Sequence, residues 1–206
     1  MLRIWGRTSS INVQKVLWAA DELGLAYERR EAGGAFGVVA TPEYRRMNPN
    51  GLVPVIEDDG FVLWESNAIV RYLCAKHSPG GLWPDDPRVR ADADRWMDWG
   101  ITTFIPGIRD AFWHLVRTDP ARRDAALVEA SRVAGEKAAA ILDAHLAGRA
   151  FVAGAAFTPG DIVLGVAAHR WLGLPLERVD RPQVRRWYDS LAARPGAAGV
   201  LGLPVS

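Results

Sequence analysis

Three short polar motifs lie in the first third of the sequence, and their residue types suit the recognition of a small charged ligand. The first, Ser9-Ser10-Ile11-Asn12, precedes a run with helical spacing. A helix N-terminus has unpaired N–H groups and a partial positive charge, so it stabilises anions. A serine hydroxyl there can also donate to a bound anion. The alternative is that Ser10 or Asn12 simply caps the helix.

The second motif places a proline where a strand is about to begin. Pro54 lies near the end of Asn48–Val55, whose sequence is NPNGLVPV. Proline cannot donate a hydrogen bond to a sheet, so its use at a strand entry suggests a special turn. If the Val53–Pro54 bond is cis, Val53 exposes its N–H and C=O, which can pair with one residue of a peptide ligand. A trans bond, the common form, is the alternative.

The third motif is Glu65-Ser66, directly before another run with helical spacing. Ser66 can serve as a helix cap only. Alternatively, the free N–H groups there bind a carboxylate while Glu65 accepts a ligand ammonium, an arrangement that suits the two charged groups of an amino acid. Together the three motifs describe one groove on a sheet of the thioredoxin type, with an anion site, a peptide-like edge and an amino-acid clamp.

The elements that must position these motifs follow the order β-α-β-loop-β-β-α. Alternating and helical periods predict strands and helices in the first 78 residues, and Asp58-Asp59-Gly60 is a hairpin signal. A helical crossover favours a parallel pairing of the first two strands. The expected strands are 2–5, 27–31, 53–57 and 61–64, the expected helices are 11–23 and 66–76, and residues 33–50 are expected to form a loop.

Almost no strand signal follows the proline- and glycine-rich segment SPGGLWPDDP. We therefore predict an α/β domain over residues 1–78, a linker over 79–87 and an all-helical domain over 88–206. Thr158-Pro159-Gly160-Asp161 is a variant of the capping box at a helix start. The expected helices are 88–116, broken near Pro106-Gly107, then 120–147, 158–171 and 182–193.

Composition and charge exclude several classes of protein. Hydrophobic residues make up 49% of the 206 residues, and the net charge is +1 with no basic block, which argues against nucleic acid as a partner. No apolar stretch is long enough for a membrane helix and no secretory signal is evident, so we expect no membrane partner and a cytoplasmic location. The single cysteine, Cys74, and four widely spaced histidines predict no metal site.

The sequence resembles the cytosolic glutathione transferases. Within that family it is most similar to the bacterial type, whose functional residues are a serine and an asparagine. The segments SSINVQKVLWAADELGLAYE, MNPNGLVPVIEDDG and LWESNAIVRYL resemble the N-terminal domain of that family, and FTPGDIVLG resembles the capping motif of its C-terminal domain. The resemblance covers nearly the whole chain. It implies a thioredoxin-like α/β domain followed by an all-α helical bundle, a homodimer, and glutathione as co-substrate without a further cofactor.

The same resemblance implies roles for individual residues. Ser10 matches the catalytic serine or threonine, and Asn12 matches a functional asparagine. Val53 and Pro54 match the cis-proline pair, and Glu65 and Ser66 match the clamp for the γ-glutamyl group. Leu52 departs from the pattern, because many relatives have a lysine there that helps to hold the glycyl carboxylate. No cysteine occupies the nucleophile region, which speaks against the glutaredoxin-like members.

The implied reaction is attack by the glutathione thiolate on a small apolar electrophile, with Ser10 as a stabiliser of the thiolate. Glutathione-dependent reduction of peroxides or disulfides is an alternative, and so is a non-catalytic binding protein on the same fold. A helix that is apolar over a wide arc must pack against two partners, and this holds for the segment WGITTFIPGIRDAFWHLVR. One partner is the helical core. The other is either the substrate in the cleft or, if these residues form core or dimer contacts only, the protein itself. Arg109 is placed to meet the glycyl carboxylate or an acidic substrate. The predicted pocket residues are Phe104, Ile108, Arg109, Phe112 and Trp113.

Overall fold

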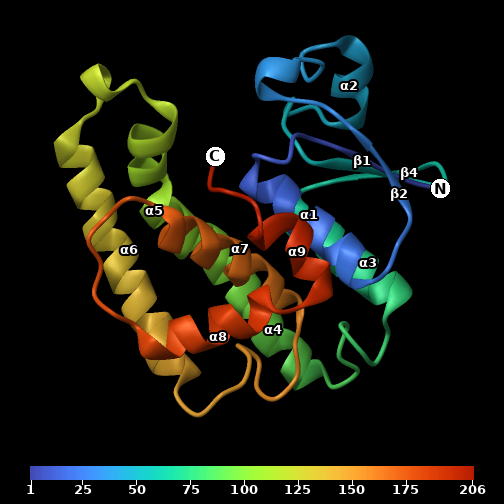
Figure 1. Ribbon diagram of the computed structural model, residues 1–206. Coiled ribbons are helices and arrows are strands. Elements are labelled where there is room, and N and C mark those ends of the chain that lie inside the picture. Colours follow the sequence, from blue (N-terminus) through green and yellow to red (C-terminus); the bar gives the residue numbers. More distant parts are fainter.

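A four-stranded mixed sheet forms the first part of the chain in the computed structural model, which describes residues 1–206 (Figure 1). The strand order is β2-β1-β3-β4, with β1 parallel to β2 and antiparallel to β3, and with β3 and β4 joined as a hairpin. The predicted parallel pairing of the first two strands and the predicted hairpin of the last two are therefore confirmed. The strands are β1 (Leu2–Trp5), β2 (Tyr27–Arg30), β3 (Val55–Asp58) and β4 (Phe61–Trp64).

Two helices, α1 (Ile11–Glu22) and α3 (Ser66–His77), pack against each other between this sheet and the rest of the molecule (Figure 1). A third helix, α2 (Pro42–Met47), lies in the segment that we expected to be a loop. The sequence does carry its signal, because the Thr41 side chain accepts a hydrogen bond from the N–H of Tyr44 and a proline opens the helix.

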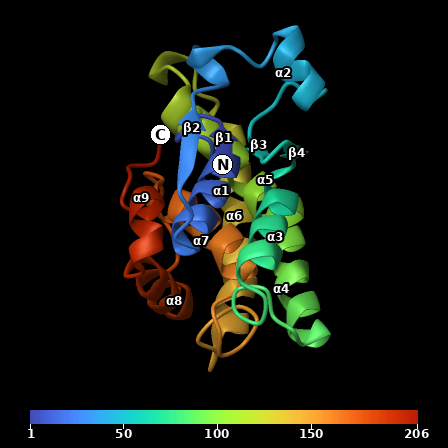
Figure 2. The ribbon, with the colours of Figure 1, turned by 90° about the vertical axis from the view of Figure 1, so that its right-hand side faces the viewer.

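The remainder of the chain is helical. Its central helix, α7 (Pro159–Gly173), is buried along most of its length and contacts α1, α4 and α8 (Figure 1). Helices α3 and α4 run side by side (Figure 2), and Asn67 Nδ2 donates to the carbonyl of Met97 between them at 3.0 Å. No helix combines the length and the apolar character that crossing a membrane requires. The other helices are α4 (Pro87–Trp99), α5 (Ile105–Phe112), α6 (Ala125–Leu146), α8 (Pro182–Ala192) and α9 (Ala198–Leu201).

The expected break near Pro106-Gly107 is wrong, because the chain stays helical from α4 through α5. A wider π-helical turn spans Gly100–Phe104, and the N–H of Ile105 bonds to the carbonyl of Gly100, five residues earlier. The wider turn admits Pro106 at the start of α5 without ending the helix. A second π-helical turn, Trp113–Arg117, follows α5 and carries side chains toward the site described below.

The start of α7 is held by a buried carboxylate. Asp161 Oδ1 accepts hydrogen bonds from Val152 N and Trp187 Nε1, both at 2.9 Å. Its Oδ2 accepts from the backbone N of Thr158 at 2.9 Å and from the Thr158 hydroxyl at 3.1 Å, which confirms the predicted capping box. Burial raises the pKa of Asp161 to about 6, although the four donors oppose this.

We expect Asp161→Asn to lower the free energy of unfolding by about 2 kcal/mol. The amide replaces one acceptor with an N–H group, so at least one buried donor loses its partner, at a cost of about 1–3 kcal/mol. Calorimetry should show a Tm about 4–8 °C lower for a chain of this size. Asp189→Asn, on an exposed position of α8, is the control and should leave the Tm unchanged. An unaltered Tm in Asp161→Asn would contradict the structural role of this carboxylate.

Candidate active site

Ser10 lies at the N-terminus of α1, but its side chain does not cap that helix. It occupies the N-cap position with extended backbone and makes no side-chain capping bond. The turn from β1 depends on Gly6, since a Cβ there would lie 2.3 Å from Val13 Cγ2. The Ser10 hydroxyl is therefore left free to donate to a ligand at the positive end of α1.

Asn12, Lys15 and Ser66 form a polar cluster behind Ser10. Lys15 Nζ lies 2.9 Å from Asn12 Oδ1 and 3.4 Å from Ser66 Oγ, and the Ser66 hydroxyl lies 3.4 Å from the same Asn12 oxygen. The Lys15 side chain is fully buried. Burial lowers its pKa to about 7, with Glu65 raising it and Arg170 lowering it further. Because Lys15 occupies the Asn12 oxygen, the amide nitrogen of Asn12 remains as a donor for a ligand.

The Val53–Pro54 peptide bond is cis, as predicted. Val53 precedes β3, and neither its N–H nor its C=O makes a hydrogen bond within the chain. The carbonyl of Leu52 is held at 2.8 Å by both Tyr44 Oη and Asn48 Nδ2, while the Leu52 side chain is 65% exposed. The backbone edge at Val53 is thus fixed in place and open to an extended ligand.

A groove joins this edge to the start of α1. Ser10, Asn12, Leu52 and Val53 line it together, so the structure brings these four predicted residues to one place. Pro54 is buried behind it. The other lining residues are Arg7, Gly33, Gly34, Val39 and Gly51.

Glu65 and Ser66 lie at the N-terminus of α3 and reach the cluster through the contact between Ser66 and Asn12. Glu65 has a φ of 73°, which residues other than glycine rarely adopt, and its side chain is exposed. A backbone conformation of this kind costs about 1–3 kcal/mol and is typical of ligand-binding positions. The exposed carboxylate and the free N–H groups of α3 can hold the two charges of an amino acid.

A second cavity, of about 270 Å³, shares Ser10 and Asn12 with the groove. Arg109, Phe112 and Trp113, three of the residues that we predicted for the electrophile pocket, line it, and Arg109 is paired with Asp110 at 3.2 Å. Phe104 and Ile108 do not line it, so their prediction as pocket residues is wrong. Both are completely buried in the main core, where a Cβ on Gly135 of α6 would lie 3.0 Å from Ile108 Cγ2.

Sequence reasoning missed several residues of this site. Lys15 lies on α1, and its signal was a lysine between the apolar residues Val13 and Val16 on a helix that is buried almost all round. Arg7, Arg117 and Arg170 line the second cavity together with Ile105. Arginines are common on exposed faces, and no pattern along the chain marks these three as neighbours.

The fold and the site together define the glutathione transferase class. The fold is a thioredoxin-like sheet followed by a helical domain. The site combines a free hydroxyl at one helix N-terminus, a cis-proline edge and a clamp at a second helix N-terminus. The family model for the glutathione S-transferase N-terminal domain matches residues 9–76, and the model for the C-terminal domain matches residues 125–190. The chain belongs to the glutathione S-transferase family.

Individual relatives agree with this assignment. The chain is 42% identical to glutathione S-transferase GstB of Escherichia coli, over all of both sequences. It is 31% identical to glutathione S-transferase D7 of Drosophila melanogaster over 82% of this chain and 74% of that protein. Among solved structures, a theta class glutathione S-transferase of Xanthomonas axonopodis pv. citri with glutathione bound matches with a TM-score of 0.96 and 45% identity, covering 100% of this chain and 99% of that one.

Proposed function

We propose that this glutathione S-transferase binds glutathione in the groove beside Val53 and conjugates its thiolate to small electrophiles held in the second cavity. The free hydroxyl of Ser10, which borders both the groove and the cavity, is the observation that carries this proposal. The glutathione bound to the Xanthomonas relative supports the choice of co-substrate. A cytoplasmic location remains a prediction from the sequence.

The groove offers complementary groups for each part of glutathione. The cysteinyl residue pairs with the free N–H and C=O of Val53, which Pro54 supports from behind. The γ-glutamyl group binds at the clamp of Glu65 and Ser66, where both its carboxylate and its ammonium find partners. Leu52 offers no charge to the glycyl carboxylate, and Arg7 is the cation that lines this groove.

The catalytic task is to keep the glutathione sulfur ionised. A free thiol has a pKa near 8.5, and lowering it by about two units requires roughly 2.7 kcal/mol of differential stabilisation. The Ser10 hydroxyl, the Asn12 amide nitrogen and the N-terminus of α1 together supply donors of the right kind. Lys15 acts as a positioning residue, because it holds the Asn12 oxygen and so directs the amide nitrogen toward the ligand.

The alternatives are less well supported. The relatives are named as transferases. The single cysteine, Cys74, is buried in α3, and burial raises the pKa of its thiol to about 12, so it is a poor nucleophile for disulfide exchange.

Turnover of 1-chloro-2,4-dinitrobenzene with glutathione, followed by absorbance, tests the proposed function. We expect saturable turnover above the uncatalysed rate. Glutathione binding without turnover of any electrophile would indicate a binding protein. Reduction of peroxides without conjugation would indicate a reductase.

We further propose that the active protein is a homodimer that uses the edge at β4. Phe61 and Val62 expose 48% and 37% of their area there, and the Phe61 ring lies 5.1 Å from that of Tyr72 on α3. Light scattering at micromolar concentration should give twice the chain mass of 22.6 kDa. Phe61→Glu should weaken the dimer, while Leu127→Glu, at another exposed apolar position on α6, should not. A fully active monomer would contradict this proposal.

Trp113 provides a test of the electrophile cavity that does not disturb the core. Its side chain lines the cavity and is 58% exposed. We expect Trp113→Ala to raise KM for an aromatic electrophile several-fold and to leave KM for glutathione unchanged. Because a surface substitution usually changes stability by less than about 0.5 kcal/mol, the denaturant midpoint should stay the same. Equal changes in both KM values would place Trp113 outside the electrophile site.

A further inference from the structure

The wall of the electrophile cavity carries three arginines that have no aspartate or glutamate partner. Arg7, Arg117 and Arg170 all line the cavity, and no aspartate or glutamate side chain lies within 4.0 Å of any of their guanidinium groups. Arg7 Nε is buried without a hydrogen-bond partner. Arginine in a partly buried place is normally paired, because an uncompensated buried charge is costly.

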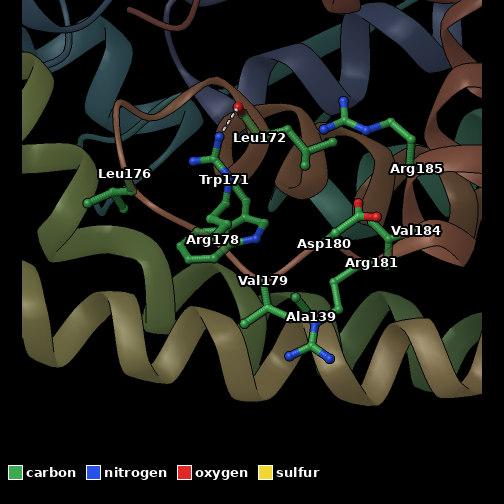
Figure 3. Close-up of a pocket in the computed structure, with 10 residues that line it drawn as sticks. All are labelled: Ala139, Trp171, Leu172, Leu176, Arg178, Val179, Asp180, Arg181, Val184 and Arg185. Atoms are coloured by element: carbon green, nitrogen blue, oxygen red, sulfur yellow. Dashed lines mark hydrogen bonds between the residues drawn. The ribbon is translucent and has the colours of Figure 1, made fainter.

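Two arginines of another crevice, Arg178 and Arg181, have partners within the chain. Between α6, α7, α8 and the segment after α7, Arg178 donates to the carbonyl of Leu172 at 2.9 Å (Figure 3). It also donates to the carbonyl of Leu174 at 2.7 Å. In the same crevice Arg181 is paired with Glu136 at 3.2 Å. Both guanidinium groups therefore have partners within the chain, although Arg181 Nε itself is buried without one.

The guanidinium groups of Arg117 and Arg170 both lie over the ring of Phe112. The Arg170 guanidinium lies 3.8 Å from the centroid of Phe112, and that of Arg117 lies 5.4 Å from it. Arg117 also donates to the carbonyl of Ser9 at 3.3 Å and to the main-chain oxygen of Ser206, the last residue, at 2.8 Å, so its position is fixed. Arg170 makes no hydrogen bond or ion pair of this kind. Burial, together with the charges of Arg117 and Arg7, lowers the pKa of Arg170 to about 10. The three cations thus repel one another in a partly buried place that no aspartate or glutamate side chain enters.

We propose that the electrophile site takes substrates that carry a carboxylate beside their apolar reacting part, an inference that rests on the proposed function. The carboxylate binds Arg117 and Arg170, whose planar guanidinium groups suit it. The apolar part lies against Phe112, Trp113 and Ile105, with the reacting carbon toward Ser10. A cavity of about 270 Å³ has room for one substituted ring, since an engineered cavity of about 150 Å³ accepts benzene.

The covalent step needs no further reagent. The glutathione sulfur, having lost its proton to solvent, forms a bond to the electrophilic carbon, and the halide leaves with the electron pair of the bond that breaks. The carboxylate of the substrate takes no part in this exchange. It therefore changes how the substrate is held and leaves the reaction type unaltered.

A carboxylate at these arginines has two sources, the electrophile or the glycyl end of glutathione. Arg7 lines both the groove and the cavity, so it does not separate the two. Arg170 and Arg117 line the electrophile cavity and are absent from the glutathione groove. Variants of these two residues therefore distinguish a carboxylate of the electrophile from that of glutathione. Loss of a contact to glutathione affects every reaction, because glutathione takes part in all of them, whereas loss of a contact to the electrophile affects only the electrophile that carries a carboxylate.

The test compares 4-chloro-3,5-dinitrobenzoate with its neutral counterpart, 4-chloro-3,5-dinitrobenzamide, each corrected for its uncatalysed rate. We expect the wild-type protein to prefer the carboxylate by about tenfold or more in kcat/KM, as a hydrogen-bonded charge contact predicts. Arg170→Met and Arg117→Met should each reduce this preference about tenfold, and high salt should reduce it in the wild type. Arg132→Met, which removes an exposed charge paired with Glu129 on α6, should leave it unchanged.

Each other result has a defined meaning. Equal efficiency with the two electrophiles in the wild type would overturn this inference and leave the proposed function intact. A higher KM for glutathione in both variants, with the preference retained, would also overturn it, since the arginines would then hold the glycyl carboxylate. No turnover of either electrophile would overturn the proposed function itself. The neutral benzamide electrophile serves as an internal control for misfolding, because a damaged fold lowers the rates with the benzoate and with the benzamide together.

Discussion

Ser10→Ala should lower kcat/KM for conjugation by about 10²–10³, the usual effect of removing one donor to a developing anion. The hydroxyl makes no capping bond in the free protein, so its loss leaves α1 intact. The remaining contacts to glutathione come from Val53, Glu65 and Ser66, so the Kd for glutathione should change little. Steady-state kinetics and calorimetric titration measure the two quantities.

Ser9→Ala is the matched control for this variant, because it removes the neighbouring hydroxyl from the same turn. We expect it to retain most of the wild-type activity. If Ser10→Ala were fully active and Asn12→Ala inactive, the main stabiliser of the thiolate would be Asn12.

Lys15→Met should lower the conjugation rate about 100-fold while making the folded protein more stable. Methionine fills a similar volume but offers no donor to Asn12 Oδ1, so the amide loses its fixed orientation, and a small misplacement of a catalytic group can cost about 10² in rate. Removing a buried cation also removes the cost of burying its charge. A residue that lowers stability while supporting activity is the expected signature of a functional site.

The gain in stability should depend on pH in a defined direction. Burial lowers the pKa of Lys15 from its ordinary value of 10.5 to about 7. Below about pH 7 the folded and unfolded states both hold the proton, so the cost of burying the charge is present in full. Between about pH 7 and 10.5 the unfolded state binds more protons, so the stability of the wild type rises with pH.

The difference in Tm between Lys15→Met and the wild type should therefore be largest near pH 6 and shrink as the pH rises toward 10. Lys137→Met, at an exposed position of α6, is the control and should show no such trend. A Lys15→Met protein that was less stable than the wild type and fully active would contradict the positioning role.

Local pattern was enough to predict the sheet, its hairpin, the helix starts at Ser10 and Ser66, and the capping box at Asp161. Each of these depends on residues that are close in sequence, such as the pair Thr158 and Asp161. The cis bond at Val53–Pro54 followed from the proline at a strand entry together with the resemblance.

The rest depends on contacts between distant segments, which a single sequence does not reveal. Pro106 marks a break only if the helix must keep its regular hydrogen bonds, and a π-helical turn removes that need. Phe104 and Ile108 are buried because α5 packs on α6, whereas the same apolar pattern also fits a pocket wall. Arg170 comes to the site from α7, far along the chain from Ser10.

The central claim is that Ser10 and Asn12 keep the sulfur of bound glutathione ionised at neutral pH. Titration of the thiolate absorbance of glutathione in its complex with the protein tests it most directly. We predict a pKa of about 6.5 for the bound thiol in the wild type, about two units below the free value near 8.5, and a return toward that free value when Ser10 and Asn12 are both replaced by alanine. A bound thiol that titrates near 8.5 in the wild type would contradict the account.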